Sequence, residues 1–199
     1  MEIRKAVITG GPGGGKSTSL KYIKDHFREK GIHVITVGET ATELIGGGVA
    51  PWTCGTPFEY QKAQIMLQIK KEEIIEQAVL TMKFDRILIV FDRGLMDNKA
   101  YMTDEEFDSI IGMYGLTEED VLKRYDGIFH LETAAKGIPD MYTLMNNDAR
   151  TEGIEDAVRL DMRTKRAWEG HPFHKVIKGK TDLEEKIKEL LSLMDELYR

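Results

Sequence analysis

The sequence predicts an α/β domain in which helices flank a five-stranded parallel sheet. Short strand-like runs alternate with helical segments along the chain, and this alternation is typical of parallel sheets with right-handed crossovers. The run at residues 86–91 is apolar almost throughout, as expected of a strand that is buried on both faces. A glycine cluster at residues 10–15 places unusual backbone freedom between one strand and one helix.

The first predicted elements are a strand, a loop and a helix. Residues 3–9 form a β-rich run that leads directly into the glycines, so we expect a strand there. Residues 16–30 have helical periodicity and are followed by Gly31, a common helix end. Residues 32–37 (Ile-His-Val-Ile-Thr-Val) predict the second strand.

The rest of the chain continues the alternation without a repeat or a linker, so we expect one domain over residues 1–199. A loop rich in Gly, Pro and Trp at residues 46–57 precedes a long helix at 58–82 and the third strand at 86–91. Later helices are expected at 104–113, 118–124, 154–168 and 183–197, and later strands at 128–131 and 175–177.

Charge and composition exclude several classes of protein. The chain has 28 Lys and Arg against 34 Asp and Glu, a net charge of −6, whereas a protein that coats nucleic acid normally carries a basic excess. The longest apolar runs, such as residues 87–91, are far shorter than the ~20 residues that cross a bilayer. A single cysteine, Cys54, and the lack of a secretory leader at the start of the sequence lead us to expect a cytoplasmic protein.

The strongest motif is Gly10-Gly-Pro-Gly-Gly-Gly15-Lys16-Ser17-Thr18, which matches G-x-x-x-x-G-K-[ST] between a strand and a helix. Backbone amides of such a P-loop converge on a polyphosphate, and the helix N-terminus adds positive partial charge. We expect Lys16 to reach the β- and γ-phosphates and Ser17 to bind Mg²⁺. The predicted nucleotide-binding residues are Gly11, Gly13, Gly14, Gly15, Lys16, Ser17 and Thr18.

Two carboxylates follow strands that lead to the same sheet edge as the P-loop. Asp92 ends the third strand, the setting of a Walker-B carboxylate that holds Mg²⁺. Glu39 follows the second strand and could orient an attacking hydroxyl and accept its proton. Loops after parallel strands emerge at one edge, so Glu39, Asp92 and Lys16 should share a crevice. The alternatives are a loop cap for Asp92 and a structural carboxylate for Glu39.

Two further groups of side chains are candidates for the reaction. Arginines in residues 146–166 are expected to form a cationic lid over the transferred phosphoryl group: Arg150, Arg159 and Arg163 are the candidates. The alternative is a solvated helix face paired with acidic neighbours. Glutamines at helical spacing lie beside aromatic residues and could read a nucleobase, although such a stripe is also typical of an ordinary polar surface: the candidates are Trp52, Phe58, Gln61 and Gln64.

These residues resemble the P-loop kinases that include deoxynucleoside kinases, thymidylate kinase and the ribosylnicotinamide kinase domain of the bacterial NAD-biosynthesis regulator. In that group a Glu that acts as base follows the second strand, an acidic residue and an Arg follow the third strand, and a lid carries arginines. Glu39 matches the place of the base, and Asp92 and Arg93 match the pair after the third strand. Gly94 stands where the nucleoside kinases usually have serine. The resemblance implies the strand order 2-3-1-4-5, a lid at about residues 136–166, and an adenine-side loop at Gly179 and Lys180.

Over nearly its whole length the chain also resembles small ATP- and GTP-binding proteins described as an AAA domain, which are related to the TRP-channel translocation-defect proteins of animals. The matching strings begin at Gly38 (Gly-Glu-Thr-Ala-Thr), Phe91 (Phe-Asp-Arg-Gly), His130 (His-Leu-Glu-Thr-Ala-Ala) and Trp168 (Trp-Glu-Gly-His-Pro). This resemblance implies nucleotide binding.

Together these features predict a Mg²⁺-dependent phosphotransferase that uses ATP or GTP and phosphorylates a small hydroxylated acceptor, such as a nucleoside or nucleotide. The acceptor is expected between Glu39, Trp52 and the start of the long helix, with Arg93 positioning it or its phosphate. A nucleotide-switched module that binds a protein or lipid partner is the alternative, and a polynucleotide end kinase is a third reading that the net charge disfavours. The oligomeric state is left open.

Overall fold

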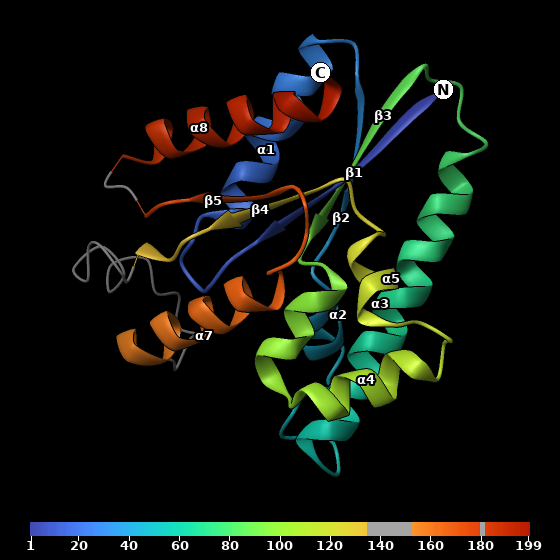
Figure 1. The fold of residues 1–199 in the computed structure, drawn as a ribbon, viewed down its shortest axis with the longest axis vertical. Coiled ribbons are helices and arrows are strands. Elements are labelled where there is room, and N and C mark those ends of the chain that lie inside the picture. Colours follow the sequence, from blue (N-terminus) through green and yellow to red (C-terminus); the bar gives the residue numbers. More distant parts are fainter. Residues whose placement is uncertain (135–152, 180–181) are drawn as a thin grey trace.

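A five-stranded parallel sheet in the order β2-β3-β1-β4-β5 forms the centre of the computed structural model, which describes residues 1–134, 153–179 and 182–199 (Figure 1). The predicted fold class and strand order are therefore confirmed. The strands are β1 (Glu2–Thr9), β2 (His33–Val37), β3 (Arg86–Asp92), β4 (Gly127–Leu131) and β5 (His174–Ile177). Because β1 pairs with both β3 and β4, its carboxyl end lies in the middle of the sheet edge, where ligands bind in open α/β folds.

Helices cover both faces of the sheet. On one face lie α1 (Lys16–Glu29) and α8 (Leu183–Asp195); the longest helix, α3 (Pro57–Val79), and α7 (Ile154–Ala167) lie on the other (Figure 1). The remaining helices are α2 (Thr40–Gly46), the 3₁₀ helix η1 (Leu95–Tyr101), α4 (Asp104–Gly112), α5 (Glu118–Leu122) and the short η3 (Glu196–Tyr198). The predicted helices differ from these bounds by a few residues at their ends, whereas η1 was not predicted.

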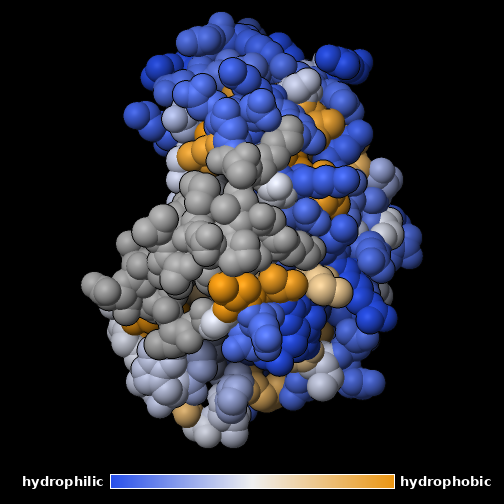
Figure 2. Space-filling model, turned by 90° about the vertical axis from the view of Figure 1, so that its left-hand side faces the viewer, coloured by the Kyte–Doolittle hydropathy of each residue, from blue (hydrophilic) through white to orange (hydrophobic). Residues whose placement is uncertain are grey.

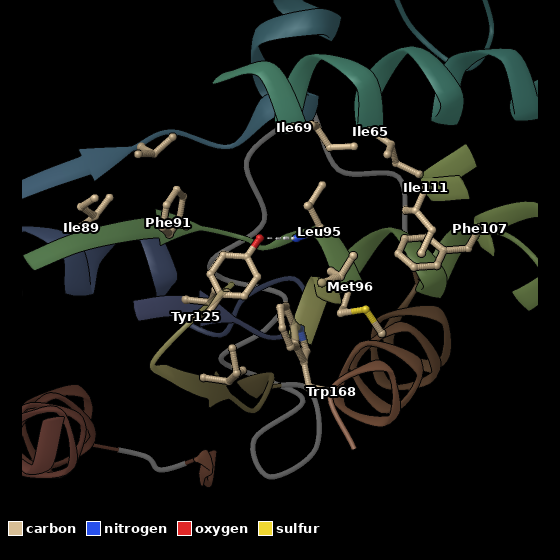
Figure 3. Packing of buried hydrophobic residues seen from close by; sticks show 14 of the residues in the cluster. Ile65, Ile69, Ile89, Phe91, Leu95, Met96, Phe107, Ile111, Tyr125 and Trp168 are labelled. Atoms are coloured by element: carbon tan, nitrogen blue, oxygen red, sulfur yellow. Dashed lines mark hydrogen bonds between the residues drawn. The ribbon is translucent and has the colours of Figure 1, made fainter. Parts of the chain in front are cut away.

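Alternation along the central strands divides the core into two clusters. Val7, Ile89 and Phe91 face the cluster under α3, α4 and η1, whereas Ile8 and Val90 face the cluster under α1 and α8. Figure 3 shows the first cluster, into which the ring of the fully buried Trp168 projects. Within residues 1–134, 153–179 and 182–199, no helix is long and apolar enough to cross a membrane.

Candidate nucleotide-binding site

Glycines give the P-loop its shape at the end of β1. Gly10 and Gly15 have φ angles of 129° and 87°, in the left-handed region where a side chain would strain the backbone. A Cβ atom on Gly14 would lie 2.5 Å from the carbonyl oxygen of Leu131, at the end of β4. The loop therefore packs directly against the neighbouring strand, and Gly15 forms the N-cap of α1.

Side chains from distant elements hold the backbone of this loop. The amide of Gly11 donates to Oδ1 of Asp161 on α7 at 2.9 Å, and Thr133 Oγ1 donates to the carbonyl of Pro12 at 2.6 Å. Lys186 Nζ on α8 donates to the carbonyl of Gly14 at 2.8 Å. The loop is thus fixed from both faces of the sheet.

The chain that follows β5 lies beside the P-loop. A Cβ atom on Gly179 would lie 3.0 Å from the carbonyl oxygen of Thr133, and a Cβ on Gly15 would lie 3.5 Å from Leu183 at the start of α8. Gly179 is therefore near the loop, and its place beside the adenine stays a prediction. Lys180, the other residue predicted there, falls outside the described residues.

Lys16 is buried, with 8% of its surface exposed. Its ammonium donates to the carbonyl oxygens of Gly10 and Gly11 at 2.9 and 3.0 Å. Burial, assisted by the positive charge of Arg93, lowers the pKa of Lys16 to about 7, although Glu39 and Asp92 act in the opposite direction. These mutual effects place the four charged groups close together, and the sequence predicts this proximity for Lys16, Glu39 and Asp92.

Asp92 ends β3 beside the P-loop strand, because it is the register partner of Ile8. Burial raises the pKa of Asp92 above its usual value, partly offset by the charge of Lys16. Its Oδ1 atom is buried and has no hydrogen-bond partner among the described residues. Ser17 and Thr18 are exposed in the first turn of α1.

The donors that surround this carboxylate fit Mg²⁺ bound together with a nucleotide. Among residues 1–134, 153–179 and 182–199, no group of three or more His, Cys, Asp or Glu side chains could hold a metal ion. Mg²⁺ usually relies on one or two protein oxygens plus substrate phosphates, and Asp92 with Ser17 supplies such a pair.

Glu39 and Arg93 form an ion pair at the same sheet edge. Thr42 Oγ1 donates to the other oxygen of Glu39 at 2.8 Å. Burial alone would raise the pKa of Glu39, but Arg93, Thr42 and Lys16 outweigh it and hold this pKa below its usual value. Glu39 is therefore ionised at neutral pH.

Arg93 has a φ angle of 69°, the one positive φ at a non-glycine position in the described part of the chain. Such a conformation costs roughly 1–3 kcal/mol and is concentrated at functional sites. Its backbone amide donates to the carbonyl of Ile8 at 3.0 Å, which ties it to β1. Burial alone would lower the pKa of Arg93, but the neighbouring Tyr101, Glu39 and Asp97 outweigh it and raise this pKa above its usual value.

Asp97, which the sequence analysis does not single out, fixes the turn after Arg93. It accepts hydrogen bonds from Thr9 Oγ1, from the amide of Gly94 at 2.7 Å and from Trp168 Nε1 at 3.2 Å. A Cβ atom on Gly94 would lie 2.7 Å from the ring of Trp168. The indole therefore occupies the space that a serine would need, which explains the glycine at this position.

Three other polar atoms, near the start of α3 and in the partner of Glu39, are buried without a hydrogen-bond partner among the described residues: Tyr60 Oη, Gln61 Oε1 and Arg93 Nη1. Tyr60 and Gln61 are only 2% and 7% exposed. Burial, assisted by the charge of Glu39, raises the pKa of Tyr60 to about 12. Buried polar groups normally have partners, so this concentration indicates a site for a polar ligand.

The other predicted acceptor residues differ in their surroundings. Gln64 Nε2 donates to Asn98 Oδ1 at 2.7 Å, so its amide belongs to a buried network instead of a polar surface. Phe58 packs against the core under α3. Trp52 is 75% exposed and makes no stacking contact that the described residues reveal. Of the predicted set, Gln61 lies best to meet a ligand.

Among the described residues, no hydrogen bond or ion pair joins an arginine of α7 to the P-loop. Arg159 pairs with Asp156 at 2.9 Å, and Arg163 Nη2 donates to the carbonyl of Met102 at 3.2 Å. The α7 face toward the P-loop carries Asp161 instead. Arg150, like the rest of residues 136–152 of the predicted lid, falls outside the described residues.

Comparison with known proteins agrees with this geometry. A family model described as an AAA domain matches residues 5–186, which is most of the chain, and a search of curated proteins found no match. The matched region contains the P-loop, both carboxylates and the strand order described above. The chain therefore belongs to this AAA-domain family and is a P-loop nucleotide-binding protein.

Proposed function

We propose that the protein transfers the γ-phosphoryl group of ATP or GTP to a hydroxyl group of a small acceptor. The observation that carries this proposal is the meeting of Lys16, Asp92 and the Glu39–Arg93 ion pair at one sheet edge. Nucleotide and Mg²⁺ binding alone would use Lys16, Ser17 and Asp92, and would leave the partly buried carboxylate and guanidinium of the Glu39–Arg93 pair without a role. Phosphoryl transfer needs both to position a nucleophile and stabilise charge.

The nucleotide side of the site is supported by preformed donors. The P-loop amides and Lys16 would hold the triphosphate, while Ser17 and Asp92 would hold Mg²⁺. When bound with the nucleotide, Mg²⁺ supplies neutralisation of the charge on the phosphate oxygens. The loop needs little rearrangement for this role, because Asp161 and Lys186 already fix its backbone.

Glu39 would orient the acceptor hydroxyl for in-line attack. A bond forms between the acceptor oxygen and the γ-phosphorus, the bond to the β-γ bridging oxygen breaks, and the nucleoside diphosphate leaves. The hydroxyl proton passes to Glu39 and then to solvent. The lowered pKa of Glu39 suits a loose transition state, in which orientation of the nucleophile matters more than early deprotonation.

Tyr60, Gln61 and Arg93 would bind the acceptor. Their unpartnered atoms offer a hydroxyl, an amide oxygen and a guanidinium nitrogen within the buried part of the site. A hydroxylated molecule with both donors and acceptors would satisfy all three.

The test is a panel of nucleosides, nucleoside monophosphates and oligonucleotide ends, assayed for acceptor-dependent release of ADP or GDP with Mg²⁺. We expect at least one small acceptor to raise release strongly and to carry the phosphate in the product. Nucleotide hydrolysis that no acceptor stimulates would contradict the proposal.

A nucleotide-switched module for a protein or lipid partner is the second candidate, favoured by apolar exposure near residues 46–57. Ile45 and Val49 are each 39% exposed and Trp52 is 75% exposed. Such neighbouring apolar side chains are typical of interaction surfaces. Capture of a partner that depends on the bound nucleotide, without acceptor phosphorylation, would favour this function.

A further inference from the structure

Asp161 is a fully buried carboxylate that has no direct part in the phosphoryl transfer proposed above. Its Oδ1 atom accepts hydrogen bonds from the amide of Gly11 at 2.9 Å, His130 Nε2 at 3.1 Å and the amide of Thr133 at 3.2 Å. The three donors lie in the P-loop, in β4 and in the chain that leaves β4. One side chain of α7 thus joins three segments of the nucleotide site.

The contact between α7 and the P-loop is also close in the backbone. A Cβ atom on Gly11 would lie 2.7 Å from Cβ of Asp161 and 3.1 Å from its Cα, so the loop cannot shift toward the helix without moving it. The charge of Lys186 on α8 attracts Asp161, because Asp161 raises the pKa of Lys186 against the larger lowering effect of burial. The carboxylate is therefore held where it is.

The C-terminal half of α7 is attached to the segment that follows Arg93. Arg163 donates to the carbonyl of Met102, and Trp168, the residue that caps α7, donates to Asp97. Asp97 in turn binds the amide of Gly94. A displacement of α7 would thus reach the turn beside Asp92, at the other half of the site.

We infer that Asp161 is a positioning residue that couples nucleotide binding at the P-loop to the position of α7. The inference rests on nucleotide binding alone and holds whether or not phosphoryl transfer occurs. If a bound nucleotide stabilises the position of α7 through Asp161, thermodynamic linkage requires that the nucleotide binds more weakly when Asp161 no longer holds the P-loop. Such couplings typically change affinity by about 5–150-fold.

Hydrogen–deuterium exchange of the full chain, with and without saturating ATP and Mg²⁺, tests the inference. In the wild type we expect ATP to slow exchange in both the P-loop and α7. Asp161→Asn keeps the size of the side chain but exchanges charge-assisted hydrogen bonds for weaker neutral ones. This variant should bind ATP at least about 5-fold more weakly, and saturating ATP should still protect its P-loop but no longer α7.

Asp156→Asn is the matched control, because Asp156 lies on the same helix and pairs only across its exposed face with Arg159 in the described contacts. It should keep both the ATP affinity and the protection of α7. The inference is overturned if the control loses as much ATP affinity and α7 protection as Asp161→Asn. It is also overturned if ATP still protects α7 in Asp161→Asn, or if ATP does not change the exchange of α7 in the wild type. The wild-type measurement decides even if the variant does not fold. Full coupling without any acceptor phosphorylation would overturn only the transfer proposed above.

Discussion

The two halves of the candidate site differ in how their polar groups are occupied. On the nucleotide side, Asp161, Thr133 and Lys186 bond the P-loop backbone from three directions. On the acceptor side, Tyr60 and Gln61 keep buried polar atoms that no described residue satisfies. A preformed loop suits the triphosphate, which is the same in every nucleotide. Under the proposed function, the unpartnered groups would bind the acceptor, which differs from one kinase to another. The unpartnered groups of Tyr60 and Gln61 would therefore select the acceptor.

Most of the face in Figure 2 is hydrophilic, with an apolar patch beside the residues drawn in grey. Exposed apolar side chains of α7 include Ile154 and Met162, at 39% and 57%. They lie on the helix that Asp161 attaches to the nucleotide side.

Lys16→Ala should have the largest effect, because it removes the ammonium that faces the phosphates. ATP with Mg²⁺ at 100 times its Kd should stabilise the wild type by about 2.7 kcal/mol. Most of this stabilisation, and all turnover, should be lost in the variant, as measured by urea unfolding with and without nucleotide. The exposed Lys21 on the same helix gives the control variant Lys21→Ala. Undiminished stabilisation by ATP would contradict the P-loop assignment.

The pH dependence of nucleotide binding follows from the same lysine. The pKa of Lys16 is lowered to about 7, and bound phosphate would raise it again by opposite charge. Binding therefore takes up a proton above about pH 7, and affinity for ATP should fall as the pH rises from 7 to 9. Calorimetry in buffers of different ionisation enthalpy measures the uptake; an affinity independent of pH would show that Lys16 is already charged.

Glu39→Gln tests the acceptor side and should have the next largest effect. Loss of a positioned base typically costs about 10²–10⁴-fold in rate, or about 3–5 kcal/mol. Acceptor phosphorylation should fall by up to this amount while ATP affinity changes little. Because the pKa of Glu39 is lowered, the wild-type rate should stay insensitive to this group above pH 5 and fall only in stronger acid.

Glu43→Gln is the control for that measurement, because Glu43 lies on α2, the helix that Glu39 caps, and pairs with Lys71 at 2.8 Å. It should leave phosphorylation unchanged. Glu39→Gln could instead bind nucleotide more weakly and still transfer phosphate normally once nucleotide is bound. That result would assign Glu39 to the nucleotide side and contradict the division of the site into two halves.

Gly94→Ala should weaken the junction between the halves. The added methyl would lie 2.7 Å from the Trp168 ring and 3.0 Å from Val7, and overpacking of this kind costs about 1–3 kcal/mol. Urea unfolding measures the loss. Gly112→Ala, where a Cβ meets nothing within 4 Å, should cost far less. Equal stability of the two variants would show that Trp168 can move aside.

Tyr60→Phe should have the smallest effect and the most selective one. A single neutral hydrogen bond contributes about 0.5–1.5 kcal/mol, so the KM for the acceptor should rise about tenfold or less. The KM for ATP should not change. Tyr22→Phe, at an exposed position on α1, is the control. A changed KM for ATP with an unchanged KM for the acceptor would place Tyr60 on the nucleotide side.

Local strings and the family resemblance predicted the elements, the P-loop and the strand order, whereas individual long-range side-chain contacts were not predicted. The P-loop is one short string, and apolar runs such as residues 86–91 mark central strands. The contact between Asp161 and Gly11 spans 150 residues, so no local pattern reveals it. In the sequence, Asp161 is only one of the acidic neighbours that could pair with arginines of its own helix.

Two further differences have the same cause. The helix η1 was not predicted, because its sequence has no clear helical period. Its start is instead fixed by the contacts of Asp97 with Thr9 and Gly94. The glutamines of α3 were compatible with a surface stripe, yet Gln64 and Gln68 are buried because Asn98 bonds both amides. Periodicity identifies a helix but does not tell which polar side chains find partners inside.

The left-handed backbone at Arg93 has a consequence for how this position responds to selection. Glycine would relieve the strained φ angle but remove the guanidinium that pairs with Glu39. A library of all substitutions at this position, sorted once for folded protein and once for activity, should therefore return opposite preferences. Sorting for folding would enrich glycine and asparagine, whereas sorting for activity would retain arginine. Drift of the gene without a functional requirement would replace arginine at this codon early.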